Sequence, residues 1–364
     1  MSLRKIARVA LTAYVSQIAL LNGVSAAEVG TTRFAIEPTV SQTLVTKIQE
    51  SSDFLKSINV VEVPEQEGER IGLTISTPVS SRTDTSGDGT RKTTDPSGME
   101  SHKYRCEKTN HDTHISYAKI DAWAKFNDFQ SRIRDLIVQS QARDRIMIGW
   151  NGVAVATTTN KTANPLLQDV NKGWLYQIRT NASTRVLDDG NLTSGATKAI
   201  YVADGVEVVN ADATNTGSAK ADYVNLDALV YDAVSLLDPW AQDDTGLVVI
   251  VGRDLLHDKY FPMVNAAGEK ATEQEARDRI LRSDKQIGGL PAVRVPAFPA
   301  GTILITRLDN LSIYFQEGTR RRQFKEVAER DRFENYESWN EAYVIEDYGY
   351  CALIENIKLG KKPA

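Results

Sequence analysis

The sequence predicts a mixed α/β (α+β) fold, and three features support this prediction. From Ile58 to Tyr117 the chain is mostly Thr, Ser, Asp, Glu, Lys and Gly, with too few apolar residues for a core of its own. Residues 120–147 carry apolar side chains at helical spacing without Gly or Pro, which predicts a helix about 40 Å long. Short apolar runs after residue 246 have the length of buried strands. We therefore expect a polar flap beside one long, rigid helix.

The bulk composition is that of an ordinary globular protein. The chain has 364 residues, of which 41% are hydrophobic and 25% are charged, enough for roughly two domains. A net charge of −5 disfavours a surface built mainly for nucleic acid, so we expect any contact with DNA to be weak or local. Cys106 and Cys351 are too few for a disulfide framework, and the later sequence has no apolar stretch long enough to span a bilayer. These features fit a reducing cytoplasm.

The N-terminal region admits two interpretations. Basic residues at 4, 5 and 8, an apolar run and small residues at 24–27 resemble a secretory signal, which would suit a secreted or periplasmic α/β binding protein. Tyr14, Ser16 and Gln17 interrupt that run, however, and apolar residues recur along one side at helical spacing. We favour the second interpretation, a short amphipathic helix that docks on a partner, and keep the first as the alternative.

The next elements are a helix and a long hairpin. Residues 40–54 predict a second short helix that ends near Ser57. Within the polar flap, residues 70–77 alternate apolar and polar side chains, and residues 114–117 also have β character, which predicts a hairpin with its tip at 83–97. Asn-Gly at 151–152 should stop the long helix, and the polar residues 183–222 predict a variable loop.

The last third of the chain has an α/β pattern that turns to β. Asn225 can cap a helix closed by Pro239, and Thr272 with Glu275 can form the capping box of another helix. Residues 247–251 form a continuous apolar run and predict a buried strand. Five further strands are expected at 292–295, 303–305, 313–316, 343–346 and 350–357.

Candidate metal and catalytic patterns are weak. The best metal-like cluster is His102, Cys106, His111 and His114, but its spacing matches no zinc template, and exposed hairpin histidines are the simpler interpretation. Residues 84–95 imitate a calcium-binding loop, but the Pro-rich flanks forbid the two helices that hold such a loop. Nucleophile, metalloprotease, kinase and dinucleotide motifs are absent from the sequence. We predict no catalytic residue, cofactor or metal.

A basic cluster is the better functional candidate. Arg320, Arg321 and Arg322 stand together, and Glu334 and Glu337 follow shortly downstream as acidic partners. The cluster is either a charged turn or a surface that meets phosphate or an acidic neighbour, such as the partner of an ion pair between subunits, and these interpretations stay open. We therefore take these five residues as a candidate interface.

An ordered series of short motifs covers nearly the whole chain. The motifs are QESSDFL (49–55), NPLLQDV (164–170) with GWL (173–175), LVVIVGR (247–253), DKYFP (258–262), LPAVRVP (290–296), NLSIY (310–314) and ENYES (334–338). Together they resemble the major capsid proteins of Peduovirus-type, P2-like tailed bacteriophages. The resemblance is weakest before residue 37, around the hairpin tip and over residues 183–222.

The resemblance implies the Hong Kong 97-type capsid fold. That fold has an N-terminal arm, an extended hairpin loop, a long spine helix, a peripheral domain and an axial domain. Applied to this sequence, it implies an N-terminal assembly segment (1–34), the arm (35–57), the extended loop (58–117), the spine helix with the peripheral domain (118–222), the axial domain (223–306) and a return to the peripheral domain (307–364).

The resemblance also implies a structural function and not an enzyme. Similar proteins self-assemble as hexamers and pentamers into an icosahedral procapsid, which matures into a head enclosing double-stranded DNA. The implied partners are other copies of the chain, an internal scaffolding protein, a maturation protease, a portal protein and, by weak contacts, packaged DNA, with no membrane. The expected location is the virion, after assembly in the cytoplasm of the bacterial host. Because similar proteins lose an N-terminal segment, we expect cleavage near Arg33, Phe34 and Ala35.

Overall fold

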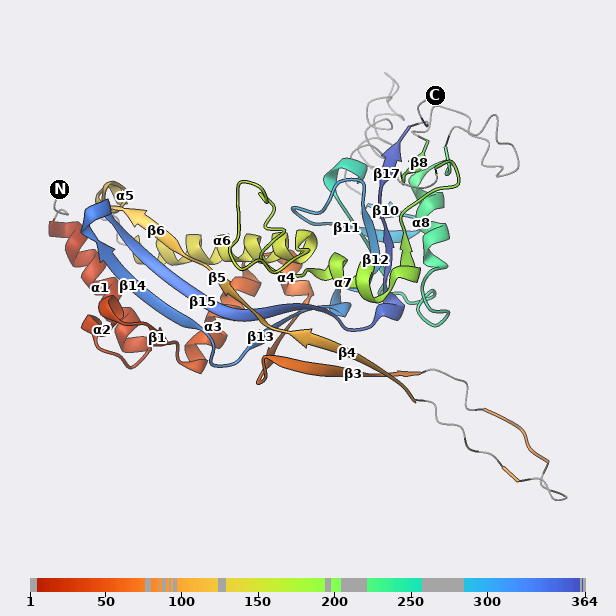
Figure 1. Ribbon diagram of the computed structural model, residues 1–364, viewed down its shortest axis with the longest axis horizontal. Helices are drawn as coiled ribbons and strands as arrows, with labels where there is room; N and C mark the ends of the chain where they lie inside the picture. Colours follow the sequence, from red (N-terminus) through yellow and green to blue (C-terminus); the bar gives the residue numbers. More distant parts are fainter. Residues whose placement is uncertain are drawn as a thin grey trace, which may run out of the picture.

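The computed structural model shows an elongated subunit with a hairpin that projects away from the body (Figure 1). The residues that it describes are 5–75, 80–84, 86, 90–91, 93, 97–123, 129–193, 198–203, 221–256, 285–360 and 362. One end carries the N-terminal helices on a long sheet, and the other end carries a second sheet (Figure 1). The predicted α/β fold class is confirmed.

The N-terminal region packs as helices against the edge of the long sheet. Its elements are α1 (Lys5–Leu21), α2 (Ala26–Thr31), β1 (Phe34–Ala35), α3 (Pro38–Glu50) and α4 (Asp53–Ser57). Ser25 and Glu28 form a capping box that starts α2. The single helix predicted over residues 40–54 is wrong in one respect, because the chain breaks into α3 and α4 where Ser52 has an extended backbone.

The predicted hairpin and long helix are both present. The elements are β2 (Asn59–Val63), β3 (Glu67–Ile75), β4 (Ser97–Arg105), β5 (Glu107–Asn110), β6 (Thr113–Ser116), α5 (Tyr117–Trp123) and α6 (Phe129–Asn151). Strands β3 and β4 pair antiparallel along their full lengths, so the predicted return strand at 114–117 is wrong: residues 114–116 lie in β6 and pair with residues 332–334 instead. Helix α6 ends at Asn151, directly before the predicted Gly152 stop. Residues 124–128 and much of the predicted tip, 83–97, lie outside the described residues.

The long sheet is built around one central strand. Among the described residues its order is β1-β14-β15-β13-β2, and β5 and β6 also pair with β15. The later strands are β13 (Leu311–Gln316), β14 (Arg321–Val327) and β15 (Arg332–Ile345). Strand β14 and β15 up to Ala342 were not predicted, because their charged side chains hide the pattern of a covered strand.

The second sheet has the order β10-β11-β9-β12-β16-β7 in the described part of the chain. Its strands are β7 (Val186–Leu187), β9 (Val248–Val251), β10 (Gln286–Ile287), β11 (Leu290–Arg294), β12 (Ile303–Thr306) and β16 (Ala352–Ile354), and β8 (Ile200–Val202) pairs with β17 (Ile357–Leu359) beside it. The predicted strand at 247–251 is confirmed. Residues 183–222 are not a simple loop, because β7 and β8 lie within them.

Helix α8 (Leu226–Val234) covers part of this second sheet. The predicted cap is confirmed, since the Ala228 backbone N–H donates to Asn225 Oδ1 over 2.7 Å. The helix predicted to open at Thr272 and Glu275 lies outside the described residues.

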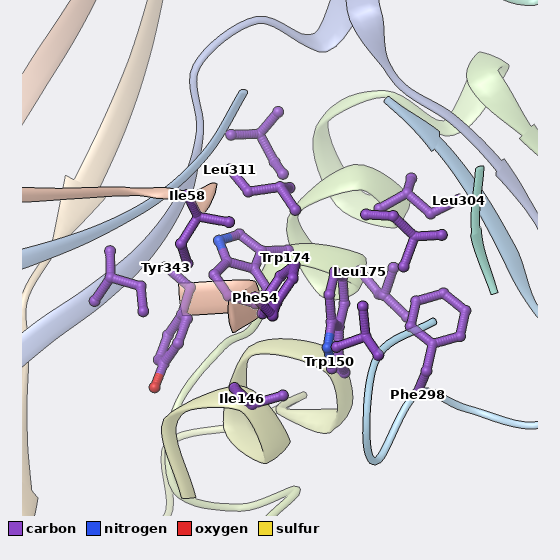
Figure 2. Packing of buried hydrophobic residues seen from close by; sticks show 14 of the residues in the cluster. Phe54, Ile58, Ile146, Trp150, Trp174, Leu175, Phe298, Leu304, Leu311 and Tyr343 are labelled. Carbon is purple, nitrogen blue, oxygen red and sulfur yellow. The ribbon is translucent and has the colours of Figure 1, made fainter. Parts of the chain in front are cut away.

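Aromatic side chains form the core where the two sheets meet (Figure 2). The Trp150 and Trp174 rings lie 4.8 Å apart, and Phe54 from α4 contacts both. Trp174 begins α7 (Trp174–Asn181), and its Nε1 donates to the Ser312 carbonyl over 3.0 Å. Gly149 is required beside this core, because a Cβ there would lie 2.2 Å from Trp174 Cζ3. This packing fixes α6 against both sheets.

Candidate assembly interface

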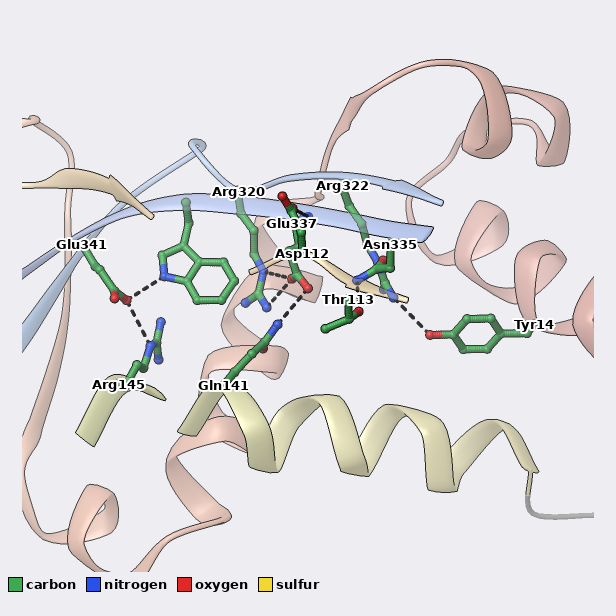
Figure 3. A network of polar contacts seen from close by, with 11 residues as sticks. Tyr14, Asp112, Thr113, Gln141, Arg145, Arg320, Arg322, Asn335, Glu337 and Glu341 are labelled. Atoms are coloured by element: carbon green, nitrogen blue, oxygen red, sulfur yellow. Dashed lines mark hydrogen bonds and ion pairs between the residues drawn. The ribbon is translucent and has the colours of Figure 1, made fainter. Parts of the chain in front are cut away.

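The candidate interface residues Arg320 and Glu337 form an ion pair inside the subunit (Figure 3). Arg320 Nη2 lies 2.6 Å from Glu337 Oε1, and the two side chains are only 6% and 3% exposed. Gln141 from α6 donates to the other carboxylate oxygen over 3.0 Å. Burial alone would raise the pKa of Glu337, but the Arg320 and Arg322 guanidinium groups outweigh it and lower this pKa to about 2. The carboxylate is therefore ionised and already paired within its own chain.

A second buried ion pair joins α6 to β15 (Figure 3). Arg145 Nε lies 3.1 Å from Glu341 Oε2, and the side chains are 2% and 0% exposed. Trp339 Nε1 and the Tyr343 hydroxyl also donate to the Glu341 carboxylate, over 2.7 and 3.1 Å. Burial favours a higher pKa for Glu341, but Arg145 and His111 lower it overall. Each carboxylate oxygen thus has a donor, as a buried charge requires.

The Trp339 ring lies between the two ion pairs. Arg320 and Arg145 lie 4.6 and 5.1 Å from its ring centroid, and the His111 ring stacks on it at 3.8 Å. Burial lowers the pKa of His111 to about 4, so this imidazole is neutral at pH 7. Because Gln141 and Arg145 are one helical turn apart and contact Glu337 and Glu341, respectively, the network fixes α6 in register on β15. We call these residues the buried ionic network.

Arg321 and Arg322 have different surroundings. Arg322 Nε donates to Asn335 Oδ1 over 2.7 Å, and its Nη2 donates to the Tyr14 hydroxyl over 3.1 Å (Figure 3). Arg322 thereby ties α1 to β14. The Arg321 side chain is exposed, and its backbone pairs with Ala35 of β1. The side chain of Arg321 is therefore accessible to a partner.

Glu334 is held by its own neighbours. Arg332 Nη2 lies 2.6 Å from its carboxylate, Arg330 lies 3.8 Å away, and the Tyr336 hydroxyl donates to it. The Tyr336 and Arg332 hydrogen bonds lower the pKa of Glu334. The structure thus gives Arg320, Arg322, Glu334 and Glu337 partners within the chain. Their assignment to an interface between subunits remains a prediction.

The predicted cleavage residues lie in a paired strand. Phe34 and Ala35 form β1 and pair antiparallel with Arg322 and Arg321 of β14. The Ile36 backbone N–H donates to the Arg320 carbonyl over 3.0 Å, and the Phe34 side chain is buried. Since a protease binds an extended, accessible backbone, the predicted cleavage would require this edge strand to separate from β14 first.

The N-terminal helix in front of this strand is part of the packed subunit. Ala7, Leu11 and Ile18 of α1 are buried in a cluster with Phe324 and Phe333 of the long sheet. The Tyr14 and Phe324 rings meet edge to face at 5.8 Å. Sequence periodicity predicted an amphipathic helix that docks on a partner, but the buried side of α1 packs on the long sheet of its own chain, and the sequence contains no sign that Tyr14 would meet Arg322.

The residues of the predicted histidine and cysteine cluster lie apart, and the expectation of exposed histidines holds only for His114, because His111 is buried and His102 is partly buried. The His102 ring packs on Tyr348, His111 packs on Trp339, and His114 is exposed on β6. Cys106 is buried, and burial raises the pKa of its thiol to about 12. In the part of the chain that the structure describes, no three His, Cys, Asp or Glu side chains converge as metal ligands, and no helix is long and apolar enough to cross a membrane.

Comparison with known proteins identifies the family. The model of the phage major capsid protein, P2 family, matches residues 10–357. A relative from Escherichia phage P2, described as capsid proteins, is 46% identical over 359 residues, covering 98% of this chain and 96% of that protein. The major capsid protein of Serratia phage KSP20 is 38% identical over 346 residues, covering 94% of each. A chain of the satellite phage P4 procapsid, solved with the size determination protein Sid, matches with a TM-score of 0.76 and 44% identity, covering 98% of this chain and 99% of that one. The chain therefore belongs to the P2 family of phage major capsid proteins.

Proposed function

We propose that this major capsid protein assembles as hexamers and pentamers, which close into an icosahedral head around double-stranded DNA. The observation that carries the proposal is the likeness to a procapsid subunit over 98% of the chain. The alternative, a secreted or periplasmic binding protein, has no support, because α1 is packed into the subunit and the full-length relatives are capsid proteins.

The shape of the subunit suits assembly through several modest contacts. The β3–β4 hairpin projects from the body, so it can reach over a neighbouring copy (Figure 1). Each copy then makes several interfaces, and none of them needs to be individually tight for a closed shell to be stable. The exposed side chain of Arg321 is a candidate contact for an acidic group of a neighbour.

The N-terminal segment has a role of its own in this proposal. Residues 1–34 act during assembly, and a maturation protease removes them by cutting near Arg33, Phe34 and Ala35. The short strand β1 supports this site, because it is an edge strand of only two residues and can be detached without breaking the central strands. The protein is then the substrate of the protease and performs no catalysis itself.

The remaining parts follow the division implied by the family. They are the arm (35–57), the extended loop (58–117), the spine helix with the peripheral domain (118–222), the axial domain (223–306) and the terminal return to the peripheral domain (307–364). Assembly takes place in the bacterial cytoplasm with an internal scaffolding protein and a portal protein, and packaged DNA touches the shell weakly. The net charge of −5 supports weak DNA contact, because like charges repel.

Electron microscopy of the purified chain, expressed with and without the scaffolding gene of its phage, tests the proposal. We expect closed shells with the scaffolding protein, and free hexameric and pentameric rings or irregular shells without it. A monodisperse monomer in both preparations would contradict assembly. Intact-mass analysis of mature particles tests the cleavage, since a chain that still begins at residue 1 or 2 would exclude it.

A further inference from the structure

We propose that the exposed face of α1 is a docking site for an acidic amphipathic helix of an assembly partner. We call this surface the outer face of α1 and define it by Val9, Ala13, Ser16 and Leu20, which lie on one side of the helix at spacings of three and four residues. The inference rests on the proposed function, because it gives the N-terminal assembly segment a specific binding surface.

Helix α1 is apolar on two opposite sides. Its inner side, with Ala7, Leu11 and Ile18, is buried against the long sheet. On the outer face, Val9 is 64% exposed and Leu20 is 76% exposed. A surface helix of a monomeric protein normally turns polar residues outward, so an outward apolar stripe indicates a contact that the isolated subunit lacks.

The shape of the outer face suits a helix. Val9 and Leu20 are about three turns apart, roughly 16 Å along the axis. Ala13 and Ser16 between them have small side chains, which let a second helix approach closely. An amphipathic helix that places its own apolar stripe here would bury both stripes.

The charges of α1 select an acidic partner. The sequence has no Asp or Glu from Lys5 to Ala27, and Lys5 and Arg8 are exposed in the first turn. The N-terminal end of a helix already carries a partial positive charge, so these cations are unfavourably placed in the free subunit. Acidic side chains on the partner, opposite Lys5 and Arg8, would neutralise this end.

A second copy of α1 fits this surface less well. It would bring the same two cations and no carboxylate. In a parallel pair the cationic ends would repel each other, and in an antiparallel pair both would stay unneutralised. The partner is therefore a different chain, and cleavage near Arg33 would release α1 from the shell together with the partner bound to it.

Binding of two synthetic peptides to the full chain tests the inference. Both peptides are amphipathic helices of about 20 residues with the same leucine stripe, one with Glu and the other with Lys on the polar face. By fluorescence anisotropy we expect the Glu peptide to bind and the Lys peptide not to bind. The double variant Val9→Ser with Leu20→Ser should weaken binding of the Glu peptide about tenfold or more, and Lys5→Glu with Arg8→Glu should abolish it.

A matched control removes exposed apolar side chains elsewhere. The double variant Tyr231→Ser with Trp240→Ser should bind the Glu peptide like the wild type, and circular dichroism should show that all variants remain folded. Equal binding of both peptides, or unchanged binding after Val9→Ser with Leu20→Ser, would overturn the inference. So would binding of the chain to anionic lipid vesicles without binding to the Glu peptide, since α1 would then be a membrane-surface helix.

Electron microscopy separates this inference from the proposed function. If the wild-type chain forms closed shells with the phage head proteins but does not bind the Glu peptide, the docking site is wrong and the capsid function stands. If the wild type forms no shells at all, the proposed function itself fails.

Discussion

The two main sheets of this capsid protein are stabilised in different ways. The second sheet is apolar throughout its centre, and Val249, Ile250 and Ile303 are fully buried. The long sheet instead buries the charged side chains of Glu337 and Glu341 beneath α6. Apolar packing tolerates small shifts of neighbouring groups, whereas a buried charge needs its partner in one position. The long sheet and α6 therefore form one unit of fixed register.

The largest expected effect comes from breaking one ion pair of the buried ionic network. Arg145→Met leaves Glu341 buried without its guanidinium partner, so we expect a loss of about 3–5 kcal/mol in the free energy of unfolding. Ile250→Val in the second sheet is the control and should cost about 1 kcal/mol. Urea unfolding of the unassembled subunit measures both.

The double variant Arg145→Met with Glu341→Met sharpens this test. Because it removes both charges and leaves apolar groups of similar size, it should recover much of the stability lost in Arg145→Met. If Arg145→Met and Ile250→Val are equally stable, the buried ion pair of the long sheet is no more sensitive to substitution than the apolar packing of the second sheet, and the contrast between the sheets is wrong.

Acid should weaken the long sheet before the second sheet. The pKa of His111 falls from 6.5 to about 4 on folding, so between these values the unfolded chain holds more protons than the folded chain. The stability from neutral His111 is complete above pH 6.5 and is lost as the pH falls toward 4, by on the order of 3 kcal/mol. Thermal unfolding followed across this pH range measures the loss.

Two histidine variants isolate the group responsible. His111→Phe keeps a ring against Trp339 but cannot be protonated, so its stability should depend less on pH in this window. His114→Gln changes an exposed histidine and should retain the wild-type pH dependence. The same pH dependence in His111→Phe and the wild type would assign the effect to other groups.

A smaller effect is expected at the edge of the long sheet. Tyr14→Phe removes the hydroxyl that accepts a hydrogen bond from Arg322, which should cost about 1 kcal/mol and loosen α1 and β1. Trypsin should then cut after Arg33 faster than in the wild type, as followed by mass spectrometry. Tyr231→Phe on the exposed side of α8 is the control and should leave the rate unchanged. An unchanged rate in Tyr14→Phe would show that this contact does not hold β1.

The smallest effect is expected beside the second sheet. Asn225→Ala removes the cap of α8 and should cost about 1 kcal/mol or less, whereas Asn225→Ser keeps an oxygen acceptor and should lose only part of that. Thermal unfolding of the two variants measures the difference in their stability. If Asn225→Ala lowers the stability more than Tyr14→Phe does, the expected order of these two effects is wrong.

The same contrast explains which parts of the fold could be predicted. The strands at 247–251 and 303–305 were found because continuous apolar runs are typical of buried strands. The strand Arg321–Val327 was missed because its charged residues look like those of an exposed turn. Local periodicity cannot reveal that such charges meet partners distant in sequence, as Gln141 meets Glu337.

The candidate site was predicted only in its composition. The sequence identified Arg320 and Glu337 as charge partners by sign, but placed them at a surface. Their burial depends on α6, which lies almost 200 residues earlier in the chain, with Gln141 and Glu337 196 positions apart. The outgoing strand of the hairpin and the cap at Asn225 were predicted because their signals are local, whereas the return strand Ser97–Arg105 was missed.

The most direct test of the internal role of these charges is a double-mutant cycle on Arg320 and Glu337, measured on the unassembled subunit. We predict that Arg320→Met and Glu337→Met each destabilise the subunit, and that the two residues are coupled by about 2 kcal/mol or more in the free energy of unfolding. If instead both variants unfold like the wild type but fail to form shells, the pair acts between subunits, and the contrast between the two sheets is contradicted.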